Sequence, residues 1–187
     1  MNFFSNYVQK LHTSLKLINE DEFLNLEKLF LEAYKNKQNI FFCGNGGSAG
    51  NANHIANDFL YGVAKRTGGG FRIKSLSSNQ SVITCLANDC GYDSIFSEQI
   101  AVYGDKDDLL VCLSGSGNSN NIINAINTAK DKDIKTISIL GYDGGTAKKI
   151  SDFFIHLNVN DMQLAEDFQL IIFHALMQSL YIKLNES

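Results

Sequence analysis

The stretch from Ser114 to Ser119, Ser-Gly-Ser-Gly-Asn-Ser, constrains the fold of this chain more than any other feature. It follows the apolar run 108–113, which is typical of a buried parallel strand, and it precedes 121–129, where apolar residues recur at helical spacing. Glycines let a backbone approach a ligand closely, and the free N–H groups at the start of a helix favour an anion. The loop is therefore a candidate phosphate site, although an ordinary turn with a helix cap explains the same residues.

A second glycine-rich loop, Gly44–Ser48, follows the apolar strand pattern at 39–43 and precedes a helical pattern at 49–61. Strands that alternate with helices, with glycine loops after the strands, predict an α/β fold with a doubly wound parallel sheet whose ligands bind at the carboxyl ends of the strands. Further strands are expected at 72–76, 136–140 and 153–157, and further helices at 79–87, 93–103, 118–131, 146–150 and 162–184.

Two amphipathic patterns, 3–18 and 21–36, precede the first strand. They predict an N-terminal helical hairpin that packs on the sheet or on another subunit. The segment 62–70 holds four glycines and the pair Lys65-Arg66, which predicts a mobile loop.

Length and charge narrow the class of protein. The 187 residues suggest one domain, 1–187, and a net charge of −4 gives no bulk attraction to nucleic acid or to an anionic membrane. The apolar run 168–182 is interrupted by polar residues, so it is expected to be a buried helix and not a membrane span. Cys43 and Cys112 lie in apolar runs and are expected to be buried thiols, which, with no visible signal peptide, favours a cytoplasmic protein.

Few residues offer chemistry. His54 and Asp58 stand four apart on one predicted helix, so they are able to share a metal, to act as an acid/base pair, or simply to pair on the surface. His174 lies among apolar residues, so it is either a histidine buried in the core or a catalytic residue. Glu166 precedes it by eight residues, about 12 Å along a helix, so one regular helix does not easily present both to one metal. Asn88-Asp89 suits a turn or a sugar contact.

The order and spacing of these motifs resemble the sugar isomerase (SIS) domain, and within it the bacterial phosphoheptose isomerase family. The resemblance rests on Cys43-Gly-Asn-Gly-Gly-Ser48, His54 with an acid four residues later, Ala87-Asn-Asp-Cys-Gly-Tyr92, Ser114-Gly-Ser-Gly-Asn-Ser119 and a histidine in the last helix. It covers nearly the whole chain, including the two leading helices.

The resemblance implies a homotetramer with active sites between subunits. It implies a zinc-assisted aldose–ketose isomerisation of a phosphorylated sugar, sedoheptulose 7-phosphate, in heptose synthesis for lipopolysaccharide or capsule. The implied substrate contacts are Asn45, Gly46, Gly47, Ser48, Asn88, Asp89, Ser114, Gly115, Ser116, Ser119 and Glu166. The implied metal ligands are His54, Asp58, Glu166 and His174, of which Asp58 and His174 match the catalytic acid/base pair.

Several positions depart from the family pattern. Asp58 stands where the family has Glu, Glu166 where it has Gln, and Gly115 where it usually has Thr. The Arg normally found four residues after the helix acid is Gly62 here. Two alternatives to a sedoheptulose 7-phosphate isomerase therefore remain. One is an isomerase of another phosphosugar in surface-polysaccharide synthesis. The other is a non-catalytic SIS protein, such as a phosphosugar sensor or a replication-initiation factor that binds DnaA.

Overall fold

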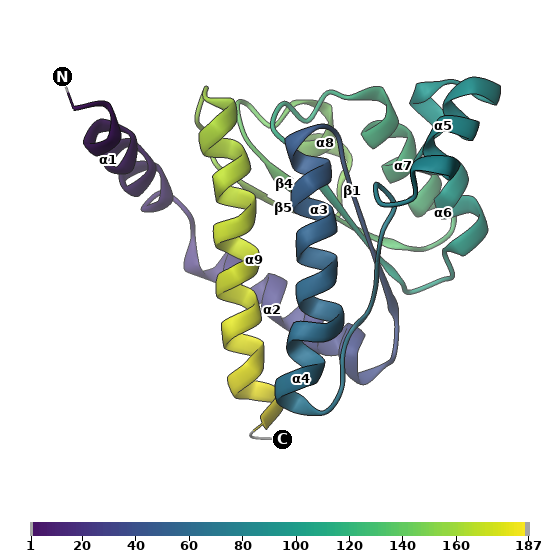
Figure 1. The fold of residues 1–187 in the computed structure, drawn as a ribbon, viewed down its shortest axis with the longest axis horizontal. Helices are drawn as coiled ribbons and strands as arrows, with labels where there is room; N and C mark the ends of the chain where they lie inside the picture. The colour runs from purple at the N-terminus through teal and green to yellow at the C-terminus, as the bar shows by residue number, and fades with distance from the viewer. Residues whose placement is uncertain (1, 186–187) are drawn as a thin grey trace.

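A computed structural model describes residues 2–185 and contains a parallel five-stranded sheet in the order β2-β1-β3-β4-β5 (Figure 1). The chain starts in the middle of the sheet and reverses direction between β1 and β3, so the carboxyl ends of these two strands form the switch point where doubly wound folds bind ligands. The predicted fold class is confirmed. The strands are β1 (Asn39–Gly44), β2 (Arg72–Ser75), β3 (Leu109–Ser114), β4 (Lys135–Leu140) and β5 (Phe153–His156).

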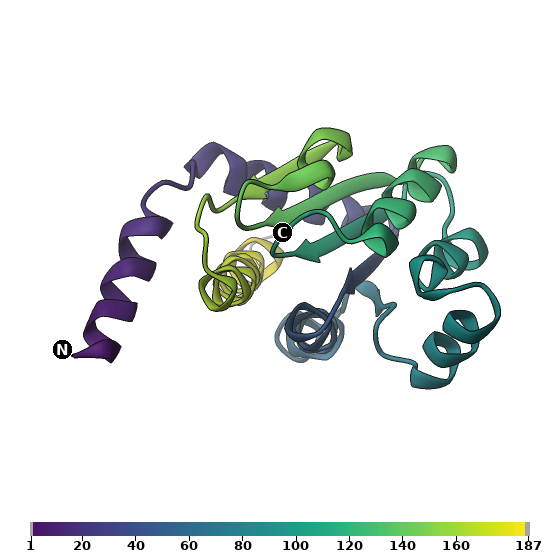
Figure 2. The same cartoon turned by 90° about the horizontal axis from the view of Figure 1, so that it is seen from above.

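Helices cover both faces of this sheet. Viewed from above, α3 and the long α9 lie side by side on one face (Figure 2). The helices are α1 (Phe3–Leu15), α2 (Glu20–Lys35), α3 (Gly47–Asn57), α4 (Val63–Thr67), α5 (Gln80–Asp89), α6 (Ser97–Tyr103), α7 (Asn120–Asp131), α8 (Gly145–Ile150) and α9 (Met162–Asn185), with a π-helical turn at Asp58–Gly62 and a 3-10 turn at Tyr92–Ser94. Within residues 2–185, none of these helices has the length and apolar character needed to cross a membrane.

Alternating strand residues build two separate cores, because successive side chains point to opposite faces of a sheet. Phe42 of β1 joins the core under α2, α3 and α9, whereas its neighbours Phe41 and Cys43 join the core under α6 and α7. Cys43 and Cys112 are buried free thiols on paired strands, as predicted. The Cys112 sulfur beside it and complete burial raise the pKa of Cys43 well above its usual value.

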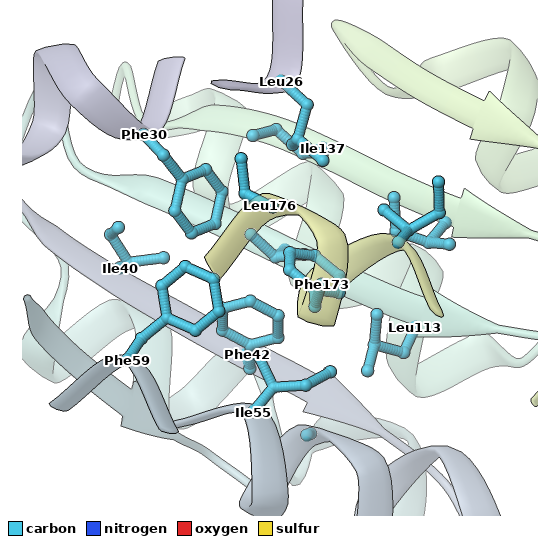
Figure 3. Packing of buried hydrophobic residues seen from close by; sticks show 14 of the residues in the cluster. Leu26, Phe30, Ile40, Phe42, Ile55, Phe59, Leu113, Ile137, Phe173 and Leu176 are labelled. Carbon is cyan, nitrogen blue, oxygen red and sulfur yellow. The ribbon is translucent and has the colours of Figure 1, made fainter. Parts of the chain in front are cut away.

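Aromatic rings fill the centre of the core beneath α3 and α9 (Figure 3). The Phe30 ring lies 5.4 Å from that of Phe59 and 5.9 Å from that of Phe173, and Phe42 lies 5.0 Å from Phe173, all centroid to centroid. Phe59 directly follows Asp58 and Phe173 directly precedes His174. The same packing that buries these rings therefore fixes where two candidate site residues emerge.

The prediction of a mobile loop at 62–70 is wrong for its first half. The helix begun by α3 continues through the π-helical turn into α4 and stops at Thr67, where Gly68 adopts a left-handed φ of 80°. Val63 is fully buried and Arg66 lies 4.7 Å over the Tyr181 ring of α9, so tertiary contacts stabilise helix despite the glycines.

The two leading helices form as predicted, but they do not pack as a hairpin. In both views α1 stands away from α2, at one side of the molecule (Figures 1 and 2). The side of α1 that carries Tyr7 faces the start of α9, where the Tyr7 hydroxyl donates to Asp167 at 2.7 Å and Lys10 pairs with Asp161. Hydrogen bonds to α9 thus direct α1 away from α2.

Candidate active site

The two glycine-rich loops leave neighbouring strands at the same edge of the sheet. Cys43 pairs with Cys112 and Gly44 with Leu113, so the loops that follow lie side by side. Between them is a pocket of about 270 Å³. It is lined by Asn45, Gly46, Gly47, Ser48, Leu113, Ser114, Gly115, Ser116, Ser119, Met162 and Glu166. Nearly all the loop residues predicted to bind substrate are therefore brought together.

The loop 114–119 has the geometry of an anion site. The Ser114 hydroxyl accepts a hydrogen bond from the Gly117 N–H at 3.0 Å, which leaves its own proton to donate. Ser119 is the N-cap of the twelve-residue helix α7, and within residues 2–185 its hydroxyl makes no capping bond. Free hydroxyls and a helix N-terminus together suit a phosphate.

The loop 44–48 is tied to the last helix. Gln169, a buried residue of α9, donates to the Ser48 hydroxyl at 3.0 Å and accepts from Asn51 of α3 at 2.9 Å. Asn51 also donates to the Glu166 carbonyl at 3.0 Å. These bonds fix the backbone of α9 at Glu166 beside the loop, and the Glu166 carboxylate lies against Gly47, where an added Cβ would be 2.3 Å from Oε1. Sequence reasoning missed Asn51 and Gln169; an amide inside the apolar run of α9 was the available signal.

His54, Asp58 and His174 form one cluster, although the two histidines are 120 residues apart. Their Nε2 atoms lie 3.0 Å apart, and Asp58 Oδ2 is 3.3 Å from His54 Nε2 and 3.6 Å from His174 Nε2. Within the described residues, the ligand atoms of all three lie within 4.8 Å of one another. All three side chains are partly exposed, so the cluster is open to a ligand.

The donor set fits a divalent metal of the zinc class. Two imidazoles and a carboxylate are a common catalytic zinc set, which leaves a position for substrate. Donors at usual zinc bond lengths stand about 3.3 Å apart in a tetrahedron. The measured separations of 3.0, 3.3 and 3.6 Å bracket that value, so a metal could enter with small shifts of these side chains.

Glu166 gathers with the predicted substrate contacts but not with the other predicted metal ligands, and Asn88 and Asp89 gather with neither group. In the described part of the chain, Glu166 lies at the loop pocket and outside the histidine cluster, as the rise of the helix anticipated. Asn88 and Asp89 are exposed at the end of α5, and neither lines the pocket between the loops. The segment reaches the site through Tyr92 instead, whose hydroxyl donates to Asn45 Oδ1 at 3.0 Å.

A larger cavity, of about 530 Å³, lies at the amino-terminal edge of the sheet beside Leu109 and Lys135. Its lining mixes lysines with acids that neutralise them, such as Lys130 with Asp152 at 3.7 Å. The glycine-rich loops, the helix N-terminus and the histidine cluster are all elsewhere, so we place the active site at the smaller pocket.

Comparisons with known proteins show the family to which the chain is similar. The family model of the SIS domain matches residues 3–141. A phosphoheptose isomerase of Helicobacter pylori (strain Shi470) is 38% identical over 173 residues, which cover 92% of this chain and 89% of the relative. The structure of a phosphoheptose isomerase from Neisseria gonorrhoeae superposes with a TM-score of 0.85 at 28% identity, over 94% of this chain and 93% of that one.

A phosphoheptose isomerase from Francisella tularensis has the same fold, with a TM-score of 0.88 at 23% identity over 94% of this chain and 93% of that one. The matched residues 3–141 include both glycine-rich loops, His54 and Asp58, and the H. pylori alignment covers most of the chain. Taken with the geometry above, these similarities establish that the chain belongs to the SIS domain proteins and, among them, to the phosphoheptose isomerase family.

Proposed function

We propose that this protein is an aldose–ketose isomerase that converts sedoheptulose 7-phosphate to D-glycero-D-manno-heptose 7-phosphate, in heptose synthesis for lipopolysaccharide or capsule. The observation that carries the proposal is the cluster of His54, Asp58 and His174 in a fold whose two glycine-rich loops line a pocket of about 270 Å³. A protein that only binds a phosphosugar has no need of two imidazoles and a carboxylate in contact.

In this proposal the phosphate lies in the loop 114–119. Ser114, Ser116 and Ser119 donate from their hydroxyls, and the N-terminus of α7 supplies the favourable dipole. Asn45, Gly46, Gly47, Ser48 and Gly115 line the same pocket and contact the rest of the sugar phosphate. Asn88 and Asp89 do not line this pocket, so they would contact sugar hydroxyls only if the end of α5 moves toward it or if they serve the site of a partner subunit.

Isomerisation moves a proton between C1 and C2 of the open-chain sugar. Asp58 and His174 act as the acid/base pair: one removes the proton from carbon to form the enediol, and the other passes a proton to oxygen. Glu166 presents its carboxylate to the sugar from beside Gly47 in the same pocket.

Zinc is the proposed metal, and His54, Asp58 and His174 would hold it, so for Asp58 and His174 the roles of metal ligand and of acid or base compete. The chemistry that a bound zinc supplies at such a position is polarisation of the sugar carbonyl. Glu166, the fourth ligand suggested by sequence, joins this set only if the start of α9 shifts or a partner subunit supplies it. We also propose a homotetramer with active sites between subunits, in the cytoplasm, where the free thiols of Cys43 and Cys112 stay reduced.

Turnover of sedoheptulose 7-phosphate in deuterated water, followed by proton NMR, tests the function. A new aldose with deuterium at C2 is the expected result, and its loss with a chelator and return with zinc would place the metal in the reaction. If the protein converts only a different phosphosugar, it is an isomerase for another step of surface-polysaccharide synthesis. Binding without conversion of any phosphosugar would overturn the proposed activity.

A further inference from the structure

Two residues outside the pocket lining hold the amide of Asn45. Asn45 Nδ2 donates to Asn121 Oδ1 at 2.9 Å, and Asn121 Nδ2 donates back to Asn45 Oδ1 at 2.9 Å. The Tyr92 hydroxyl donates to the same Asn45 Oδ1 at 3.0 Å. Asn121 is only 2% exposed in the first turn of α7, two residues after Ser119, so the pair links the first loop to the second.

A count of donors and acceptors shows what remains for a ligand. A primary amide has two N–H donors and an oxygen with two lone pairs. The oxygen of Asn45 already accepts two hydrogen bonds, and one of its N–H groups is given to Asn121. Among residues 2–185 nothing accepts the second N–H, and Asn45 lines the pocket between the loops. Asn45 therefore has one donor and no acceptor left to offer.

The two partners have different tasks. A reciprocal amide pair fixes the plane of the Asn45 side chain, but the pair remains intact if both amides turn over together, because nitrogen and oxygen simply exchange places. The Tyr92 hydroxyl favours one of the two arrangements. It donates to the Asn45 oxygen as observed, whereas in the exchanged arrangement it would have to accept from an Asn45 N–H, and a phenol oxygen is a weaker acceptor than the O–H is a donor. Asn121 therefore fixes the plane of the amide, and Tyr92 favours the observed orientation.

We propose that Asn121 and Tyr92 are positioning residues that hold the Asn45 amide so that it presents one N–H donor to an oxygen of the sugar phosphate. The kinetic test of this inference rests on the proposed function, because it measures turnover. A second test, by NMR spectroscopy, does not depend on that function.

Kinetic measurements on variants distinguish a residue that positions the Asn45 amide from one that only stabilises the fold. Asn121→Leu is expected to raise KM for sedoheptulose 7-phosphate about fivefold to tenfold, with kcat changed less than about twofold, because a contact made equally in ground and transition states is weakened. Tyr92→Phe, at an exposed residue, removes only the hydroxyl and is expected to raise KM about twofold. In an Asn45→Ala background neither change should raise KM further.

Asn127→Leu is the matched control. Asn127 lies further along α7, where it is exposed and does not line the pocket between the loops. Its KM should equal that of the wild type. Equal effects of Asn121→Leu with and without Asn45, or an unchanged KM in Tyr92→Phe, would overturn the inference.

The spectroscopic test needs no turnover. In the side-chain region of an amide NMR spectrum of the unliganded protein, Asn45 is expected to show one N–H proton protected from exchange and one unprotected. Asn121→Leu should remove that protection. Protection that survives in Asn121→Leu would contradict the positioning role even if the enzyme is active. If Asn121→Leu removes the protection but the wild type does not convert sedoheptulose 7-phosphate, the positioning role of Asn121 is supported and the proposed function is wrong.

Discussion

Gly117 and Gly46 both hold a positive φ, 67° and 54°, but their surroundings differ. A Cβ on Gly117 would lie 2.0 Å from the Gly144 carbonyl oxygen, so it would clash with backbone and not with a flexible side chain. A Cβ on Gly46 would meet no described heavy atom within 4 Å. The backbone of the second loop is therefore packed against the segment after β4 at Gly117, whereas Gly46 of the first loop has open space beside it.

Gly117→Ala is expected to destabilise the protein by about 2–4 kcal/mol, because strain in φ and a backbone clash add. Gly46→Ala, the control, adds no clash and carries only the backbone strain of φ 54° and ψ −121°, about 1–3 kcal/mol. Urea unfolding of both variants measures the difference. Equal losses would show that the neighbours of Gly117 move aside without cost.

The histidine cluster makes the sharpest residue-level prediction. Asp58→Ala and His174→Ala are each expected to lower kcat by about a hundredfold or more, since each removes an acid or base from the proton transfer. Both should also bind less zinc, as measured by atomic absorption of the purified protein. Asp131→Ala, at an exposed carboxylate at the end of α7, is the control and should retain full activity. Full turnover in both Asp58→Ala and His174→Ala would rule out the mechanism.

At the scale of elements, one buried charge ties α2 to the end of α9. Glu27 is 2% exposed, accepts a hydrogen bond from Ser179 and pairs with Lys183. Burial alone raises its pKa, but the hydrogen bonds from Lys183 and Ser179 outweigh burial, so the pKa of Glu27 lies below its ordinary value. An acid with a lowered pKa stabilises the fold above its unfolded pKa, and this stabilisation disappears as pH falls through the lowered value.

Glu27→Gln is expected to cost about 1–3 kcal/mol of stability at neutral pH, because a charge-assisted pair is lost while the partly exposed lysine stays solvated. The variant should also lose less stability than the wild type below about pH 5. Glu32→Gln, whose pair with Lys28 on the same helix is exposed at 3.9 Å, should cost less than about 0.5 kcal/mol. Chemical unfolding across pH tests all three proteins. Parallel pH curves for Glu27→Gln and wild type would refute the assignment.

At the scale of the whole molecule, α1 is the element that the rest of the chain leaves uncovered. Its residues Phe3 and Phe4 are 80% and 76% exposed, and Val8 is 47% exposed. Each described residue of α1 keeps some exposure, and the helix stands to one side of the molecule in both views (Figures 1 and 2). An apolar helix face of this kind is typical of a surface that another protein covers, and a second copy of the chain agrees with the homotetramer proposed above.

Phe3→Ser with Phe4→Ser is therefore expected to shift the protein from tetramer to smaller species, since apolar contact area between copies is lost. Light scattering after size-exclusion chromatography measures the mass, and activity should fall with it if active sites lie between subunits. Val102→Ser, a change of an equally exposed residue on α6, should leave the mass unchanged. A double variant with an unaltered tetramer would remove α1 from the interface.

Local patterns in the sequence were enough to predict the sheet, its helices and both glycine-rich loops, because side-chain periodicity and glycine preference act between near neighbours. The same reasoning failed at 62–70, where burial of Val63 and the contact of Arg66 with Tyr181 outweigh the local signal of the glycines. It also failed for the packing of α1, whose direction depends on Asp161 and Asp167, far away in the chain.

The sequence by itself determined which residues carry chemistry, and the tertiary structure decided which of them meet. His54 and Asp58 were expected to share a helix face, but His174 joins them only because the Phe30, Phe59 and Phe173 rings pack α9 against the helix that carries them. Glu166, on the same helix as His174, lies instead at the loop pocket. Contacts between residues so distant in sequence depend on the order of the strands and on the packing of the helices over them, and no local pattern records either.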